Sequence, residues 1–337
     1  SEYKKWHELD VTDELLNDKD FWKFEKGCAT RQASGDVLNK LTSFIPNLMG
    51  GSADLAPSNK SDMKNTGFFS KEDRSGQNIH FGVREHAMAA ITNAIAAHGG
   101  LKAYCATFFV FSDYMKGAMR LSALMNLPVT YILTHDSIGV GEDGPTHQPI
   151  EQLAALRSLP NMTVFRPADP NETAAAWFYA VTNKTTPTSL VLTRQNLPLY
   201  DIDGKVALKG AYILKDSKNE TPDVILMASG SEVELIMGAA DELAKKGVDA
   251  RVVSMPSFEL FEAQSDEYKE SVLPKAVRNR VAVEAASTFG WHKYVGLDGE
   301  VIGLDHFGAS APAGTLFKEF GFTVENVVET ALKVVGK

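Results

Sequence analysis

Short apolar runs alternate with amphipathic stretches through the first two thirds of the chain. Strands are predicted over residues 103–109, 129–133, 162–165 and 189–192, where the side chains are continuously apolar or β-branched, as in strands buried on both faces of a parallel sheet. A helix is predicted to begin after Asp169, because Pro170 and Glu172 complete the pattern of a capped first turn. The alternation predicts a first α/β domain with a largely parallel sheet.

The same alternation restarts near residue 223. Strands are predicted over residues 223–227, 251–255 and 280–284, and an amphipathic helix over residues 324–335. Ser231 and Glu234 have the spacing of a second capping box. The turn around residues 228–231 stands at a helix start and could hold an anion, but a capped helix with no ligand explains the same residues and is the favoured interpretation. This pattern predicts a second α/β domain.

Two segments without this alternation set the predicted domain limits. Residues 1–24 are charged and aromatic and are expected to form an arm or short helices lying on another surface. Residues 198–222 are polar and rich in turn-forming residues. We therefore expect an arm over residues 1–24 and α/β domains over residues 25–204 and 215–337.

Composition excludes several classes of protein. The 337 residues carry 34 Lys and Arg against 43 Asp and Glu, and this net charge of −9 argues against binding to a nucleic acid backbone. The two cysteines, Cys28 and Cys105, have no metal-ligand spacing and are too few for a disulfide scaffold. No apolar run is long enough for a membrane span. We expect a cytoplasmic protein that binds neither nucleic acid nor membrane.

The densest group of polar residues directly follows the strand predicted over residues 129–133. Residues 134–147 include His135, Asp143 and His147, at the carboxyl end of a strand, where parallel sheets bind ligands. The same segment contains the glycine spacing of a dinucleotide site, but its acidic residues and Pro145 are unsuited to a pyrophosphate at a helix start. A metal site using the two histidines with Asp136 and Asp143 is possible and unspecific. Two histidines and three acids in fourteen residues favour a functional loop.

Other candidates have ordinary explanations when each is taken alone. Glu85 begins an apolar helix, where a carboxylate commonly interacts with the helix dipole. Phe108, Phe111 and Tyr114 are spaced by three, which would place them on one arc of a helix, usually as core. Arg31, Ser58 and Arg194, near predicted turns or strand ends, would alone be solvated polar residues.

Taken together, these segments resemble transketolase, the thiamine diphosphate enzyme of the pentose phosphate pathway. The resemblance rests on long irregular matches that continue through nearly the whole chain. They are GGSADLAPSN at residues 50–59, GVREHAM at 82–88, THDSIGVGEDGPTHQP at 134–149, RPAD at 166–169, RQNLP at 194–198, ASGSEV at 228–233 and DHFGAS at 305–310.

The resemblance implies a role for the residues that looked ordinary alone. In this family, a carboxylate at the Glu85 position hydrogen-bonds N1′ of the coenzyme's aminopyrimidine and so promotes the imino tautomer that removes the thiazolium C2 proton. Phe108, Phe111 and Tyr114 would form the aromatic pocket for the pyrimidine ring. Asp54 would lie near the coenzyme across a subunit boundary.

The substrates implied by the resemblance are sugar phosphates. Arg31, Ser58, His135 and Arg194 would bind the phosphate. Asp143 would bind a sugar hydroxyl and discriminate stereochemistry, and His147 would hydrogen-bond substrate oxygens as a two-carbon ketol unit moves from a ketose to an aldose.

The chain departs from the family pattern by lacking the domain that binds the diphosphate. There is no Gly-Asp-Gly followed some thirty residues later by Asn, the signature that holds Mg²⁺ or Ca²⁺ there. We therefore expect no metal ligands in this chain, a homodimer that needs a complementary domain, and little transferase activity from the chain alone. We expect it to be either one subunit of a split transketolase or the carboxyl-terminal part of a longer chain that was shortened by truncation or proteolysis.

Two rival functions remain. A 1-deoxyxylulose-5-phosphate synthase or a pyruvate dehydrogenase β subunit would share the glutamate and the pyrimidine domain, although residues 138–149 and 194–198 resemble transketolase more. A non-catalytic partner that keeps the fold for assembly is the alternative outside enzymes, and it would be expected to lose Glu85 and the aromatic residues.

Overall fold

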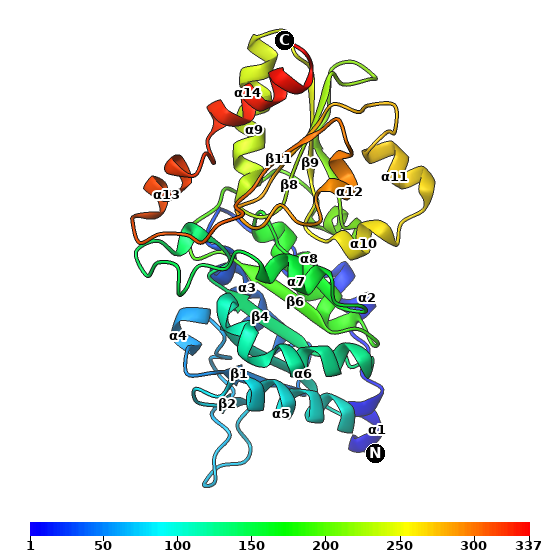
Figure 1. Ribbon diagram of the computed structural model, residues 1–337. Coiled ribbons are helices and arrows are strands. Elements are labelled where there is room, and N and C mark those ends of the chain that lie inside the picture. The colour runs from blue at the N-terminus through cyan, green and yellow to red at the C-terminus, as the bar shows by residue number, and fades with distance from the viewer.

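The computed structural model describes residues 1–337, apart from the side chain of Glu2. Figure 1 shows two α/β domains, one above the other, each built on its own sheet. The amino-terminal half of the chain forms the lower domain and the carboxyl-terminal half the upper one. The predicted fold class, two α/β domains with largely parallel sheets, is therefore confirmed. Among the described residues, no helix has the length and apolar character needed to cross a membrane.

The first sheet has six parallel strands in the order β2-β1-β3-β4-β6-β5. These strands are β1 (Leu48–Ser52), β2 (Asn78–His80), β3 (Lys102–Phe108), β4 (Thr130–Thr134), β5 (Thr163–Phe165) and β6 (Thr188–Leu192). Side chains alternate between its faces, so that Ile132 points into one apolar cluster and its neighbours Tyr131 and Leu133 into the other. Burial on both faces explains why these strands are apolar throughout.

Helices cover both faces of this sheet. One face carries α3 (Thr30–Leu41) and α8 (Pro170–Thr182), and the other carries α5 (Glu85–His98), α6 (Ser112–Leu124) and α7 (Gln152–Arg157). The amino-terminal residues form α1 (Glu2–His7) and α2 (Thr12–Asn17), and Leu15 and Phe21 pack into the cluster shared by α3 and α8.

The second sheet has five strands in the order β11-β10-β8-β9-β7. They are β7 (Tyr212–Lys215), β8 (Val224–Ala228), β9 (Ala250–Ser254), β10 (Arg280–Val283) and β11 (Glu300–Ile302). Only β7, at one edge, runs antiparallel to its neighbour. On one face lie α9 (Glu232–Lys245) and α14 (Val324–Val334), and on the other α10 (Phe258–Glu262), α11 (Asp266–Val272) and α12 (His292–Val295).

The two predicted capping boxes have different outcomes. Asp169 caps α8 as predicted, because its side chain accepts a hydrogen bond from the Glu172 backbone N–H. The prediction for Ser231 is wrong. Ser231 has helical backbone angles and makes no side-chain cap, and its hydroxyl donates instead to the Glu232 carboxylate at 2.6 Å. The buried carboxylate beside it competes successfully for the hydroxyl.

Asp169 and Glu172 form a buried acidic pair that faces the second domain. Tyr212 and Ser254 of the second sheet donate hydroxyl hydrogen bonds to the Glu172 carboxylate. No cation pairs with either acid among the described ion pairs. Burial raises the pKa of both carboxyls, and the proximity of Asp169 adds to the rise at Glu172.

We predict that this pair makes stability depend on pH. Because the pKa of the Glu172 carboxyl is raised in the folded chain, its contribution is favourable at low pH and is lost as pH rises through the folded pKa. Glu172→Gln removes that ionisation, so the melting temperature of the variant minus that of the wild type should rise by a few degrees, about 1–2 kcal/mol, between about pH 5 and pH 8. Thermal melts at constant ionic strength measure this difference.

The exposed Glu234→Gln on α9 is the matched control, and its melting difference should not change with pH. A pH-independent difference for Glu172→Gln would show that the Glu172 carboxyl has the same pKa in the folded and unfolded chain.

Candidate active site

The candidate residues lie where four neighbouring parallel strands end. Asp54 and Ser58 follow β1, Phe108 ends β3, His135 follows β4 and Arg194 follows β6. Ser58 belongs to the short helix α4 (Ala56–Asn59). Because the carboxyl ends of parallel strands share one edge of the sheet, residues far apart in sequence meet there.

A positively charged cluster forms around Arg31, on the first turn of α3. Its guanidinium donates to the Ser58 carbonyl oxygen at 2.8 Å and lies 3.4 Å from Nε2 of His135. Burial and the nearby Arg194 charge lower the pKa of Arg31. Neither arginine pairs with a carboxylate among the described residues. Two unneutralised guanidinium groups at one strand end suit an anion.

A hydrogen-bond relay fixes the protonation of His135. Thr134 Oγ1 donates to Asn59 Oδ1 at 2.7 Å and lies 2.8 Å from Nδ1 of His135, so Nδ1 carries the proton that completes the contact. Nε2 then presents its lone pair to Arg31. Burial and the arginine charges lower the pKa of His135 to about 3, which keeps the ring neutral at physiological pH.

Phe108, Phe111 and Tyr114 form a row of aromatic rings, here called the aromatic shelf, next to this charged cluster. Phe108 and Phe111 stack with ring centroids 5.9 Å apart, and Tyr114 continues the row at 5.9 Å from Phe111. The His135 ring lies 3.7 Å from Phe108, and His147 approaches Phe111 edge-on at 5.4 Å. The arrangement offers flat apolar surface between two imidazoles.

The predicted arrangement of the trio on one helix is wrong. Phe108 is the last residue of β3, Phe111 lies in the 3₁₀ turn Phe109–Phe111, and Tyr114 is on α6. The chain changes from strand to turn to helix over seven residues, and the change of backbone direction still brings the three rings together.

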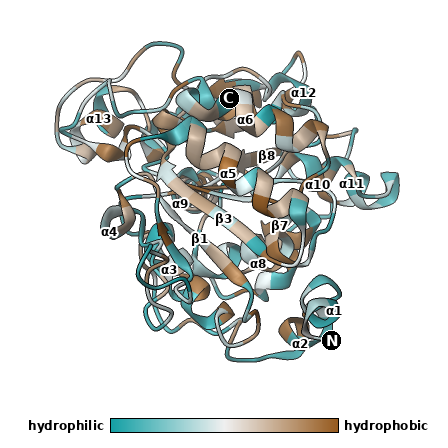
Figure 2. Cartoon of the chain, turned by 90° about the horizontal axis from the view of Figure 1, so that it is seen from below, coloured by the Kyte–Doolittle hydropathy of each residue, from teal (hydrophilic) through white to brown (hydrophobic). Residues whose placement is uncertain are grey.

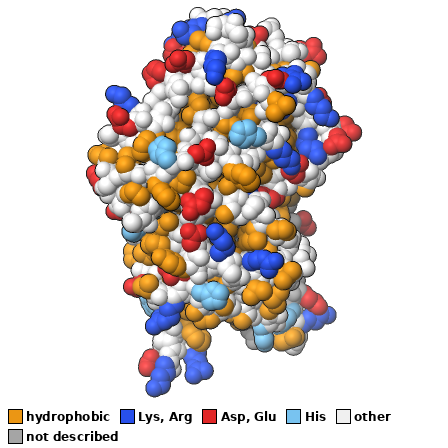
Figure 3. All heavy atoms as spheres, viewed as in Figure 1, with side chains coloured by type: hydrophobic (Ala, Val, Ile, Leu, Met, Phe, Trp, Pro, Cys, Tyr) orange, Lys and Arg blue, Asp and Glu red, His pale blue; other side chains and the backbone are white. Residues whose placement is uncertain are grey.

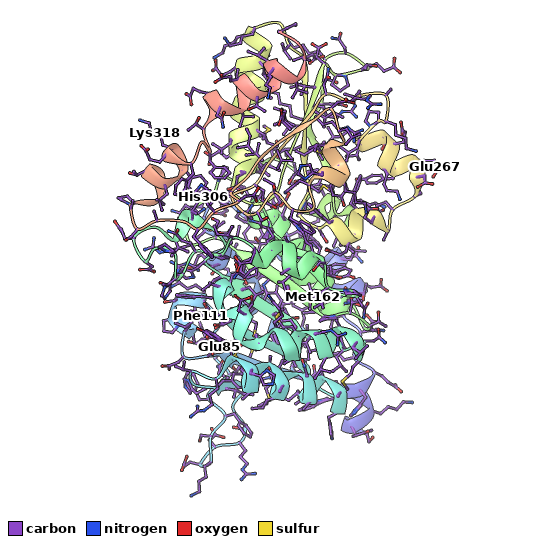
Figure 4. All side chains as sticks on the ribbon, in the orientation of Figure 1. Glu85, Phe111, Met162, Glu267, His306 and Lys318 are labelled. Atoms are coloured by element: carbon purple, nitrogen blue, oxygen red, sulfur yellow. The ribbon has the colours of Figure 1, made fainter. Side chains whose placement is uncertain are left out.

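Glu85 is the first residue of α5, and its side chain is 8% exposed. Its carboxylate accepts no side-chain hydrogen bond from the described residues. Helix α5 packs along α6, and a Cβ placed on Gly117 of α6 would lie 3.7 Å from the ring of His86. Figure 4 shows Glu85 and Phe111 on the side of the molecule where α4 lies. A largely buried glutamate without a described hydrogen-bond donor, at the same edge of the sheet as the aromatic shelf, fits a flat ligand that carries a proton to share.

Asp54 and Asp143 are placed differently from the other candidates. Both are exposed, and no described hydrogen bond joins either to another candidate residue. Asp54 has a left-handed backbone with φ of 63°, like His135 at 64°, and such strain in non-glycine residues gathers at functional sites. Asp143 lies in the turn between Gly141 and Gly144.

Two other readings of the polar loop find no support in the structure. Gly139 lies in the 3₁₀ turn Ile138–Val140, and the next α-helix begins only at Gln152. The helix start that a dinucleotide site requires directly after these glycines is therefore absent. The Asp136 carboxylate is 2.9 Å from the Arg166 guanidinium. Across the part of the chain that the structure describes, no three His, Cys, Asp or Glu side chains gather as metal ligands.

Comparison with known proteins decides the family. Residues 26–199 match the model of the transketolase pyrimidine-binding domain, and residues 210–323 match that of the transketolase-like C-terminal domain. The chain belongs to the transketolase family. The transketolase of Bacillus subtilis is 57% identical over 338 residues, which cover 98% of this chain and 51% of that protein.

Solved structures of transketolases agree with this assignment. A transketolase from Pichia stipitis in complex with fructose 6-phosphate superposes with a TM-score of 0.91 and 45% identity, over 99% of this chain and 50% of that one. A split-gene transketolase, described as an inactive β4 tetramer, superposes with a TM-score of 0.75 and 25% identity, over 92% of this chain and 99% of that one. The chain thus spans about half the length of the curated relatives it matches.

Sequence reasoning missed the polar contacts that orient the predicted transketolase residues. Thr134 was recognised only as part of the polar loop, and Asn59 only as part of a motif, although together they set the tautomer of His135. The signal that could have found them is their position, one at the end of β4 and the other in the short helix α4 that follows β1.

Proposed function

We propose that this chain is the pyrimidine-binding and C-terminal part of a transketolase. With a complementary diphosphate-binding domain, it would transfer a two-carbon ketol unit from a ketose phosphate to an aldose phosphate. The observation that carries the proposal is that Glu85, the aromatic shelf and the arginine pair all lie at the edge of one parallel sheet where the carboxyl ends of its strands are. The complementary domain would be a separate subunit or another part of a longer chain.

The residues present suit thiamine diphosphate. Phe108, Phe111 and Tyr114 would pack against the aminopyrimidine, and Glu85 would share a proton with its N1′ in a site closed to water. Asp54 would lie near the coenzyme across a subunit boundary. When bound, the coenzyme supplies the carbon nucleophile that takes up the ketol unit. Mg²⁺ or Ca²⁺ would be held by the complementary domain.

The charged cluster around Arg31 suits the phosphate of a sugar. Arg31 and Arg194 would donate to its oxygens, Ser58 would contribute its hydroxyl, and His135 would orient Arg31. A bound dianion would favour the protonated form of His135, which could then donate as well. Solved Pichia stipitis transketolases hold xylulose 5-phosphate and sedoheptulose 7-phosphate, sugars of this class.

His147 and Asp143 would contact the sugar itself. His147 lies edge-on to the aromatic shelf, where its ring could hydrogen-bond oxygens near the reacting carbons as the ketol unit moves. Asp143 would bind a hydroxyl and select sugar stereochemistry from its exposed turn. Both cysteines are free thiols, which suits the cytoplasmic location we expect.

An exposed apolar face supports the need for a partner. Figure 2 shows hydrophobic colouring along α5 and α6, and Figure 3 shows hydrophobic side chains reaching the surface in the lower half of the molecule. The large exposed side chains on these helices and their flanks are Val83, Ile91, Tyr114, Leu121, Leu124 and Met125. Several large exposed apolar side chains on two packed helices are typical of an interaction surface. We propose that it packs against the complementary domain and against a second copy in a homodimer.

Complementation tests the proposed function. The chain with thiamine diphosphate, Mg²⁺, xylulose 5-phosphate and ribose 5-phosphate should give no turnover, and addition of the diphosphate-binding domain of a close relative should restore it. Leu121→Glu on the apolar face should reduce the restored activity at least about tenfold by weakening association. Enzymatic detection of glyceraldehyde 3-phosphate measures turnover, and sedimentation measures association.

Exposed Glu329→Gln in the second domain is the control and should leave association unchanged. Robust turnover without a second polypeptide would contradict the proposal. Turnover with pyruvate as donor instead of a ketose phosphate would favour the synthase or dehydrogenase alternative. Failure of every complementary domain to restore activity would favour a non-catalytic assembly partner.

A further inference from the structure

The loop over residues 135–149, here called the substrate loop, packs into the second domain. Ile138 in this loop and Ile150 just after it belong to the apolar cluster formed by α9, α14 and the second sheet. Near its other end, Gln148 Nε2 donates to the Gly141 carbonyl at 2.8 Å and to the Ala309 carbonyl at 2.9 Å. The substrate loop therefore begins on a strand of the first domain but takes its core contacts from the second.

A single buried guanidinium ties the start of this loop to the second domain. Arg166, directly after β5, approaches the Asp136 carboxylate with Nε at 3.0 Å and Nη2 at 2.9 Å. Its Nη1 donates to the Ser229 carbonyl at 2.9 Å and to the Glu232 carboxylate. Asp136 belongs to the substrate loop, whereas Ser229 and Glu232 belong to the second domain, so Arg166 bridges the two.

The surroundings of Arg166 are shaped to seat it. Gly230 has φ of 59°, and a Cβ there would lie 2.8 Å from Cζ of Arg166, so only glycine fits. The turn at residues 228–231, considered above as a possible anion site, therefore holds a cation. Burial opposes the charge on Arg166, but Glu232 and Asp136 more than offset this and raise its pKa.

A gain in the free energy of unfolding is a poor explanation for the buried ion pairs around Arg166. Replacing a buried ion pair with apolar residues is often neutral or stabilising, whereas removing one partner leaves an uncompensated buried charge. Two arginines, Arg157 and Arg166, face three carboxylates, Asp136, Glu232 and Glu284. The consequence of this arrangement is geometric, because it permits a single position of Asp136 relative to the second sheet.

The fixed position of Asp136 bears directly on His135. The left-handed backbone of His135 persists only where its surroundings hold it. The Thr134 contact to Asn59 holds it from the first domain, and Asp136, joined to it by a peptide bond, holds it from the second.

We propose that Arg166 is a positioning residue through which the C-terminal domain sets the geometry of the charged cluster that binds the sugar phosphate. Arg166 is fully buried and acts through Asp136 on His135 and the rest of the substrate loop. The link to substrate rests on the proposed function, whereas the link to loop order does not.

Amide hydrogen exchange on the full chain tests the positioning directly. Arg166→Lys keeps the charge but loses the fork that reaches both Asp136 and Glu232. Loop amides, such as that of Gly139 bonded to Ser137 Oγ at 3.2 Å, should exchange about tenfold faster in the variant. Peptides covering β3 and β4 should keep their wild-type rates.

Arg157→Lys is the matched control. Arg157 shares Glu284 and Ser229 with Arg166, but it pairs with Glu284 at 2.7 Å and 2.9 Å and stacks on Phe258, and no described hydrogen bond or ion pair joins it to Asp136 or the rest of the loop. Its variant should leave loop exchange unchanged. Asp136→Asn should reproduce the effect of Arg166→Lys, and it decides the question if the arginine variant does not fold.

Kinetics of the complemented enzyme extend the test to substrate. Arg166→Lys should raise KM for sugar phosphates about tenfold, leave kcat within about twofold and leave KM for an unphosphorylated sugar unchanged. Equal loop exchange in both arginine variants, or wild-type exchange in both Arg166→Lys and Asp136→Asn, would overturn the proposal. A complemented wild type without turnover would count against the proposed function instead, and the exchange result would still decide the role of Arg166.

Discussion

Replacing Glu85 with glutamine is expected to lower turnover of the complemented enzyme by about 10²–10⁴-fold, the usual contribution of general acid–base catalysis. Glu85 is buried at the start of α5, at the same edge of the sheet as the aromatic shelf, and its carboxylate accepts no side-chain hydrogen bond from the described residues. Glutamine keeps the size of the side chain but can neither gain nor lose the proton shared with a ring nitrogen. Steady-state assays at saturating coenzyme measure the effect.

Glu151→Gln is the matched control for Glu85. Glu151 is an exposed acid just before α7, close in sequence to the substrate loop but outside the proposed site. This variant should keep wild-type turnover. Full activity in Glu85→Gln or Glu85→Ala would remove Glu85 from the reaction and leave it as a helix-dipole residue.

Removal of either Arg31 or Arg194 should produce the second largest effect. Arg31→Met and Arg194→Met should each lower kcat/KM for sugar phosphates by about 10–100-fold, because each loses a charge-assisted hydrogen bond to the phosphate. The basis is the proximity of two guanidinium groups that no described carboxylate neutralises. Transfer assays with phosphorylated and unphosphorylated acceptors separate the phosphate contribution from general damage.

The unphosphorylated acceptor should lose little activity in both variants. Arg278→Met is the control, because Arg278 is exposed in the second domain and pairs with Asp298. An equal loss for both acceptors would show that the arginines support the fold or the coenzyme and not the phosphate.

Much of the fold follows from local pattern. The strands of the first sheet are apolar throughout because helices cover both of its faces. The continuous apolar run over residues 129–133 therefore predicted strand β4 from the sequence alone. The antiparallel direction of β7 was not predicted, because a short edge strand carries no sign of its pairing partner. The sequence correctly predicted the helix cap at Asp169 but not the one at Ser231. The Ser231 hydroxyl donates instead to the buried carboxylate of Glu232, the first residue of the same helix.

The site was predictable in part. The polar loop after β4 was recognisable by its place at the end of a buried strand. The roles of Glu85 and the aromatic trio came only from resemblance to a family, since each has an ordinary explanation from spacing alone. The geometry of the trio was mispredicted because period-three spacing was taken as helical where the chain passes from strand to turn to helix.

The contacts that cross domains were beyond local pattern. Arg166 meets Asp136, which is 30 residues away, and Glu232, which is 66 residues away. Such pairs depend on how two sheets are stacked, and neither composition nor periodicity carries that information.

The most direct test of the account follows the proton that Glu85 is proposed to govern. In the complemented enzyme, the C2 proton of bound thiamine diphosphate exchanges with deuterium from the solvent. Acid quench stops this exchange at chosen times, and NMR then measures how much of the C2 proton remains. We predict fast exchange in the wild type and exchange at least about 10²-fold slower in Glu85→Gln, with coenzyme still bound. Equal exchange rates in the two proteins would contradict the proposed role of Glu85 and, with it, the assignment of this site to ketol transfer.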